Sequence, residues 1–124
     1  MVDTPALLQP RVRKELRAYL SELQADDPRD TWRAERASGL VSGIDQVFHF
    51  FFDDHDFDAT AVGLSLVCAT EVRLIGDLKT ALAAILNEVG DAGDDDFVSH
   101  PRWPMVRQAA NTANAGLARD ANGS

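Results

Sequence analysis

The chain has 124 residues, of which 45% are hydrophobic and 26% are charged, and its formal net charge is -8. This length predicts one domain with a modest core, and the hydrophobic fraction excludes an intrinsically disordered chain. The acidic excess argues against nucleic acid as a partner, because a polyphosphate backbone would be repelled. That excess lies in residues 37–101, which hold two bases and twelve acids.

Apolar residues repeat at helical spacing along most of the chain and predict four main helices and one short helix. The predicted helices cover residues 5–24, 38–53, 59–67, 70–89 and 103–118. Thr4 and Pro5 suit the cap and the first position of the first helix. Arg13, Lys14 and Arg17 lie off its apolar stripe, and we expect these side chains to be solvated.

The second helix carries an apolar stripe on one face. The stripe consists of Leu40, Val41, Ile44, Val47, Phe48, Phe51 and Phe52. Phe50 lies off the stripe, so it either fills a groove beside another helix of the chain or is an exposed anchor for a partner. Residues 30–37 either extend this helix backwards from an Asp30 cap or form a loop that places Trp32 on the core.

The later helices have clearer end signals. Asp56 or Asp58 suits the cap of the short helix, Thr70 suits the cap of the long one, and Gly90 suits its left-handed end. An acidic loop over residues 91–96 precedes the last helix. The pattern predicts an all-α, single-domain helical bundle over residues 1–118, with a frayed tail over 119–124.

Two groups of carboxylates concentrate the negative charge. The first acidic cluster is Asp53, Asp54, Asp56 and Asp58, and the second acidic cluster is Asp91, Asp94, Asp95 and Asp96. If the long helix runs back beside the second one, both clusters lie at one end of the bundle, where their fields add. They are the predicted binding surface for a basic partner.

Residues 53–56 also suggest a metal site, because Asp53, Asp54, His55 and Asp56 are rich in oxygen and nitrogen ligands. The pattern lacks the turn glycine and the distal glutamate of a calcium loop, so helix capping is the favoured interpretation and no cofactor is expected. Asp45, His49 and Asp53 lie on one helix face. They could transfer a proton or bind a metal ion, but we favour a solvent-exposed row of Asp–His–Asp contacts, which we call the ladder.

The remaining polar features favour structural roles. His100 and Pro101 lead into the last helix, and Trp103 is expected to pack inward. Arg102 and Arg107 are expected to pair with the acidic residues of 91–96. Cys68 is expected to be a buried small hydrophobe, and a single thiol points to the cytoplasm. No apolar run reaches the length of a membrane span, so we expect a soluble protein.

Two segments, in this order, resemble a known family. Residues 47–54, VFHFFFDD, resemble a VHFLFDD signature, and residues 100–106, HPRWPMV, resemble an HPxWPxV signature. Both are found in a small family of actinobacterial proteins to which no function is assigned. The resemblance covers residues 30–118 and implies an intracellular helical protein of an immunity or other interaction type.

These observations lead to three hypotheses. The favoured one is a cytoplasmic interaction module, not an enzyme, whose acidic surface binds a basic protein partner. The second is a divalent-metal enzyme or sensor that uses residues 53–58. The third is a homodimeric structural protein that associates through Phe50 and the alanine face of the last helix.

Overall fold

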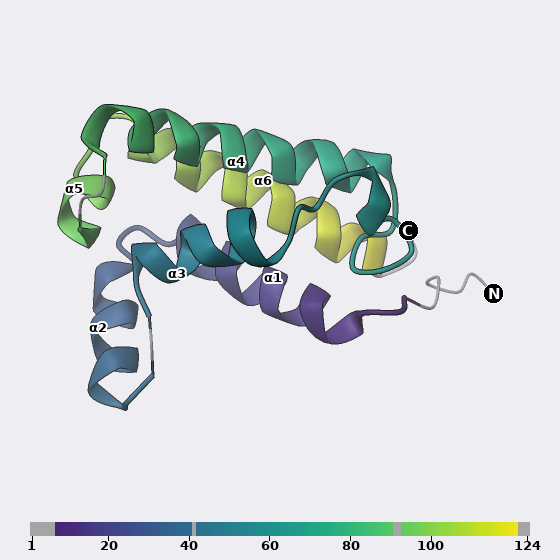
Figure 1. Ribbon diagram of the computed structural model, residues 1–124, viewed down its shortest axis with the longest axis horizontal. Helices are drawn as coiled ribbons and strands as arrows, with labels where there is room; N and C mark the ends of the chain where they lie inside the picture. Colours follow the sequence, from purple (N-terminus) through teal and green to yellow (C-terminus); the bar gives the residue numbers. More distant parts are fainter. Residues whose placement is uncertain (1–6, 41, 91–92, 122–124) are drawn as a thin grey trace.

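The computed structural model describes residues 7–40, 42–90 and 93–121, and these ranges contain helices and no strand (Figure 1). The predicted all-α single domain is confirmed. The elements are α1 (Pro10–Gln24), α2 (Arg29–Ala37), α3 (Ile44–Phe48), the π-helical turn η1 (His49–Asp54), the 3-10 turn η2 (Ala59–Ala61), α4 (Ala69–Val89), α5 (Asp94–Val98) and α6 (Trp103–Ala121). Within the described ranges, no helix is long and apolar enough to cross a membrane.

The long helices α1, α4 and α6 form the centre of the core, and α6 packs along both of the others. Figure 1 shows α4 beside α6, with α3 and η1 between α4 and α1 in this view. The fully buried apolar side chains of the three helices are Leu16, Leu20, Leu23, Ile75, Leu78, Leu82, Ile85, Val106, Ala110, Ala113 and Leu117. These residues occupy helical spacing, so the periodicity predicted the centre of the core.

Helix α1 begins five residues later than predicted. Pro10 takes the first-turn position, where its missing amide hydrogen costs nothing. The amides of Leu8 and Gln9 donate to the carbonyls of Gly63 and Leu64, at 3.1 and 2.9 Å. This pairing ties Leu8 and Gln9 to the loop at Gly63 and Leu64. Thr4 and Pro5, the predicted cap and first position, lie outside the described residues.

Residues 30–37 belong to a separate helix, α2, which also buries Trp32 against the core. One predicted alternative gave these residues as helical, and the other placed Trp32 on the core; the structure combines the two features. Helix α3 begins at Ile44, six residues later than predicted, because the chain turns at two glycines. Gly39 and Gly43 have φ values of +89° and +127°, which side chains other than glycine rarely adopt.

The inward face of α3 and η1 also differs from the predicted stripe. Leu40 precedes the break and is exposed, and Val41 lies outside the described residues. The buried residues are Ile44, Val47, Phe50 and Phe51, with i, i+3, i+6 and i+7 spacing. Phe50, which lay off the predicted stripe, is buried, and Phe52, which the stripe included, is 37% exposed.

The predicted helix over residues 59–67 is reduced to the single turn η2. Asp58 caps this turn, because the Thr60 amide donates to its Oδ1 at 2.9 Å, which confirms one of the two predicted caps. Gly63 then turns the chain with a φ of +89°, and its amide donates to the Leu66 carbonyl at 2.8 Å. This tight loop replaces the expected helix.

The remaining boundaries lie close to those predicted. Helix α4 begins at Ala69, so Cys68 and not Thr70 is its N-cap, and Gly90 ends it with a φ of +67°. The second half of the predicted acidic loop forms the short helix α5. Helix α6 continues to Ala121, three residues beyond the predicted end, and residues 122–124 lie outside the described ranges.

Candidate functional site

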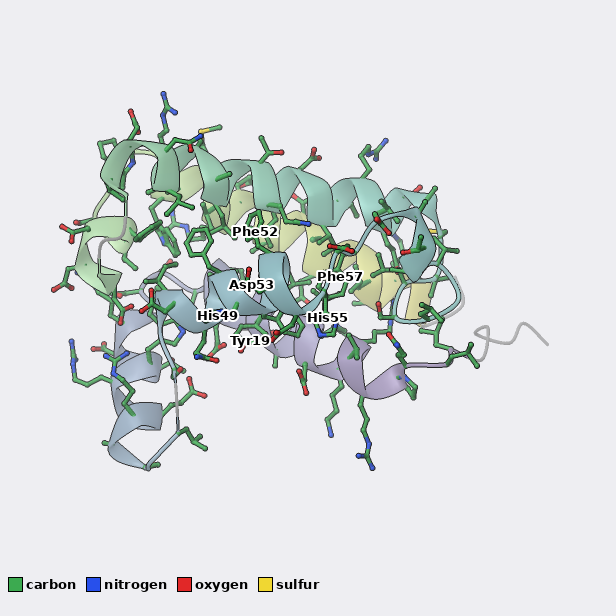
Figure 2. All side chains as sticks on the ribbon, in the orientation of Figure 1. Tyr19, His49, Phe52, Asp53, His55 and Phe57 are labelled. Atoms are coloured by element: carbon green, nitrogen blue, oxygen red, sulfur yellow. The ribbon has the colours of Figure 1, made fainter. Side chains whose placement is uncertain are left out.

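An aromatic cluster surrounds the π-helical turn η1. The Phe50 ring stacks on Tyr19 of α1, with centroids 4.4 Å apart, and Phe50 is 3% exposed. His55 lies between Phe50 and Phe57, with centroid distances of 4.9 and 5.2 Å. Phe50 therefore fills a groove beside another helix of the same chain, and its alternative role as an exposed anchor is wrong. Figure 2 shows Tyr19, His55 and Phe57 gathered beside η1.

The backbone is strained where the chain leaves η1. Phe57 is buried and has a φ of +51°, a left-handed conformation that costs a bulky residue about 1–3 kcal/mol. Its packing on His55 and Phe51 holds it there. A π-helical turn and a strained aromatic residue so close together are typical of functional segments.

An apolar groove lies on the other side of η1, between η1, α4 and α5. It has a volume of about 300 Å³ and contains Phe52, which is 37% exposed, and Leu86, which is 38% exposed. The complete lining is Asp45, Phe48, Phe52, Asp53, Leu86, Gly90 and Phe97. Figure 2 shows Phe52 between η1 and α4 with Asp53 next to it. Sequence reasoning missed this groove because it placed Phe52 and Leu86 in the core.

A cation already lies over the exposed aromatic ring. The Lys79 Nζ atom is 5.2 Å from the Phe52 centroid and donates to the Asp56 carbonyl at 2.8 Å. An aromatic face attracts a cation at this distance. The ring of Phe52 is therefore presented to positive charge at the edge of the groove.

The first acidic cluster is exposed, and its Asp53 lines the groove. In the part of the chain that the structure describes, none of its four carboxylates forms an ion pair with Lys or Arg. Asp53 Oδ2 is 2.7 Å from His49 Nδ1, which is one step of the predicted ladder. Hydrogen bonds from the hydroxyl and amide of Thr60 lower the pKa of Asp58. The charge of Lys79, which lies beside Asp56, adds to the lowering of the Asp58 pKa and offsets part of the cluster's charge.

The second acidic cluster is instead used inside the fold. Asp94 accepts from Arg36 Nη1 at 3.0 Å and from the Ile44 amide at 2.8 Å. Asp95 accepts from Arg29 Nη1 at 2.9 Å. These contacts join α5 to α2 and to the first residue of α3, so we call them the α2–α5 clamp. Asp96 accepts from the Gly93 amide at 3.3 Å, and Asp91 lies outside the described residues.

The two acidic clusters do not form one continuous patch. Asp56 lies beside Lys79 in the middle of α4, whereas α5 follows the end of α4 at Val89. Lys79 and Val89 are ten residues apart, which at 1.5 Å per residue is a distance of about 15 Å along α4. This exceeds the Debye length of about 8 Å at physiological ionic strength. Asp53, at the other end of the first cluster, lines the groove together with Gly90 and Phe97, so the addition of the two fields stays a prediction.

The structure offers little for the metal and homodimer hypotheses. Among the described residues, no group of three or more His, Cys, Asp and Glu side chains is placed to hold a metal ion, and His55 is engaged with aromatic rings. The surfaces expected to form a homodimer, Phe50 and the alanine face of α6 with Ala110 and Ala113, are buried within the chain.

A buried ion pair, which sequence reasoning missed, joins α1 to α4. Arg13 forms two hydrogen bonds to Glu71, at 2.8 and 2.9 Å, and also donates to the carbonyls of Ser65 and Leu117. Glu71 is fully buried and Arg13 is 8% exposed, so the expected solvation of Arg13 is wrong. Hydrogen bonding to Glu71 holds the pKa of Arg13 above its usual value. This network joins α1 to α4, to the chain before α4 and to α6, and Arg13 also lines a cavity of about 440 Å³ on the α1 side.

The segment before α6 has the expected structural role but different partners. His100 Nε2 lies 2.8 Å from Glu88 Oε2, and its Nδ1 accepts from the Arg102 amide at 3.0 Å. Trp103 is buried, as predicted. Arg102 approaches Glu88 at 3.8 Å and Arg107 approaches Asp26 at 3.6 Å, so neither has the expected pairing with the described acids Asp94, Asp95 and Asp96.

Cys68 is only half-buried, and its Sγ lies 3.8 Å from Asp120 Oδ2. The prediction of a buried small hydrophobe is therefore wrong: Cys68 stands at the N-cap position of α4, without a side-chain capping bond, and has one polar neighbour.

Residues 7–123 match the family model described as "Domain of unknown function (DUF7945)", and the chain belongs to that family. No curated protein and no solved structure matches the chain. The family description names no activity, ligand or partner.

Proposed function

We propose that this protein is an interaction module that binds a basic, partly apolar segment of a protein partner in the groove beside η1. The observation that carries the proposal is the exposure of Phe52 and Leu86 between two carboxylates, Asp45 and Asp53. An apolar anchor of the partner would fill the groove, and flanking Lys or Arg side chains would meet the carboxylates.

Charge complementarity selects a basic occupant. The first acidic cluster adjoins Asp53 and lacks Lys or Arg partners in the described chain. Its field would accelerate the approach of a basic partner and repel an acidic one. The same charge disfavours nucleic acid and anionic membranes as partners. The module acts by binding and not by catalysis.

We further propose that the family is the actinobacterial one suggested by the two sequence signatures. An immunity-type role is then the special case in which the basic segment belongs to a toxin. The protein would act in the cytoplasm, where the single thiol of Cys68 stays reduced.

The test uses a synthetic amphipathic helix of Lys and Leu, with a Glu and Leu counterpart as the charge control. We expect calorimetry to detect binding of the basic peptide alone, with an affinity that falls as salt is added. Phe52→Ser is expected to weaken binding about tenfold or more, as loss of a central aromatic anchor does.

Two matched variants separate the groove from general surface effects. Met105 is 62% exposed on α6, away from the groove, so Met105→Ser should bind as the wild type does. Asp53→Asn should weaken binding and reduce its salt dependence, whereas the same change at Asp77, which is exposed on α4, should do neither. Equal binding of both peptides, or unchanged affinity in Phe52→Ser, would overturn the proposal.

A further inference from the structure

A second apolar groove lies between α4 and α6, the two long helices that run side by side in Figure 1. This α4–α6 groove has a volume of about 450 Å³ and shares no lining residue with the groove beside η1. Its complete lining is Leu74, Asp77, Ala81, Pro104, Met105, Gln108, Ala109 and Thr112. Among these described residues, Asp77 is the one charged side chain. An exposed apolar surface of this kind is typical of an interaction site.

The α4–α6 groove combines small side chains with one protruding apolar side chain. Ala81 and Ala109 are half-buried and leave room between the helices. At Gly116, α6 comes so close to α4 that a Cβ there would lie 2.7 Å from Leu74 Cδ1. Met105, which is 62% exposed, protrudes from the α6 side. A hollow beside an apolar protrusion is self-complementary, because a two-fold rotation sets the protrusion of each copy against the hollow of the other.

The charges on the exposed face of α4 are self-complementary as well. Arg73 and Asp77 are exposed, lie about one helical turn apart, and form no ion pair within the described chain. When two copies meet with their α4 helices antiparallel, Arg73 of each copy faces Asp77 of the other. These two charges cancel on this face, whereas the net charge of -8 makes two copies repel each other elsewhere. Charge complementarity therefore favours a second copy as the occupant.

The area of this face is sufficient for a specific contact. Helix α4 has 21 residues and α6 has 19, so each is about 30 Å long at 1.5 Å per residue. Side by side they are about 20 Å wide and present a face of about 600 Å². Two copies would bury about 1,200 Å² in total, which is the lower end of the range for specific interfaces. We therefore expect a reversible association that depends on protein concentration.

We propose that two copies of this chain form a symmetric dimer through the α4–α6 groove. Met105 of each copy packs on the groove of the other, and Arg73 pairs with Asp77 across the two-fold axis. This interface differs from the alanine face of α6, where Ala110 and Ala113 are buried within the chain. It also leaves the groove beside η1 uncovered in both copies, so the dimer does not depend on the proposed binding of a basic partner.

Analytical ultracentrifugation of the full chain at a series of protein concentrations tests the dimer. We expect the mass to rise from that of one chain to that of two as the concentration approaches about 0.5 mM, because a small interface dissociates at micromolar concentrations or above. Met105→Ser should raise the dissociation constant about tenfold or more, because it removes the protruding apolar anchor.

A charge exchange is the sharper test. Asp77→Arg alone sets arginines against each other across the axis, and Arg73→Asp alone does the same with carboxylates, so each should weaken the dimer. Combining the two changes restores opposite charges in the contact and should restore the dimer. Glu15→Arg makes the same charge change as Asp77→Arg on the exposed surface of α1 and should leave the dimer intact.

Three results would overturn the proposal. The first is a monomer at every concentration, which would leave the α4–α6 groove to a helix of another protein. The second is an unchanged dissociation constant in Met105→Ser. The third is a combined charge exchange that dimerises no better than Asp77→Arg alone.

Discussion

The buried ion pair between Arg13 and Glu71 is the most demanding test of how the helices are held together. Glu71→Gln keeps the size of the side chain but leaves the Arg13 guanidinium buried without a counter-charge. Breaking one partner of such a pair costs about 3–5 kcal/mol, because the remaining charge is desolvated and uncompensated. A domain of this length has a free energy of unfolding of about 6–19 kcal/mol. Glu71→Gln therefore removes a large share of it.

The measurement is urea unfolding, supported by thermal melts. At about 4 °C per kcal/mol for a chain of this size, we expect the melting temperature to fall by about 12–20 °C. Arg33→Gln is the control, because the exposed pair of Arg33 and Asp30 is worth about 1 kcal/mol or less. Replacing both buried partners, as Arg13→Met with Glu71→Leu, should cost less than Glu71→Gln alone. A loss below about 1 kcal/mol for Glu71→Gln would refute this account of the buried pair.

Two further predictions concern a glycine and an ion pair. Gly43→Ala should lower the free energy of unfolding by about 1–3 kcal/mol, because φ is +127° and the new Cβ would lie 2.9 Å from Arg36 Nη1. Gly76→Ala, in open space inside α4, should raise it by about 1 kcal/mol, and urea unfolding compares the two. Hydrogen bonds from Arg29 lower the pKa of Asp27 to about 2. The stability that Asp27 contributes is present above its unfolded pKa and is lost as pH falls towards 2, so acid unfolding curves of Asp27→Asn should lack this component.

The sequence was sufficient to predict the features that follow from local patterns. The inward residues of α4, including Ile75 and Leu82, repeat at helical spacing, and Gly90 ends that helix with the expected left-handed backbone. Asp58 caps the turn that follows it. Each of these features depends on residues that are close together in the chain, and a single sequence shows them directly.

The features that could not be predicted depend on contacts between distant residues. Arg13 lies off the apolar stripe of α1, and only the arrival of Glu71, 58 positions later, makes its burial possible. Charge counting likewise treated all the acids alike, although Asp95 is paired with Arg29 from 66 positions away. Phe52 is exposed within the π-helical turn η1, and α3 begins late because the backbone at Gly43 is left-handed; a helical wheel reveals neither feature.

The two acidic clusters have different consequences for binding, although both contribute to the net charge of -8. Asp94 binds Arg36 and accepts a hydrogen bond from the amide of Ile44, the first residue of α3. Its carboxylate therefore helps to fix where α3 begins. The start of α3 in turn sets the rotation of the helix that presents Phe52 to the groove. The second cluster thus positions the aromatic anchor, while the first cluster supplies exposed carboxylates beside it. Because these roles are separate, a charge change at Asp94 should distort the groove, whereas a change at Asp53 should alter only its attraction for a basic partner.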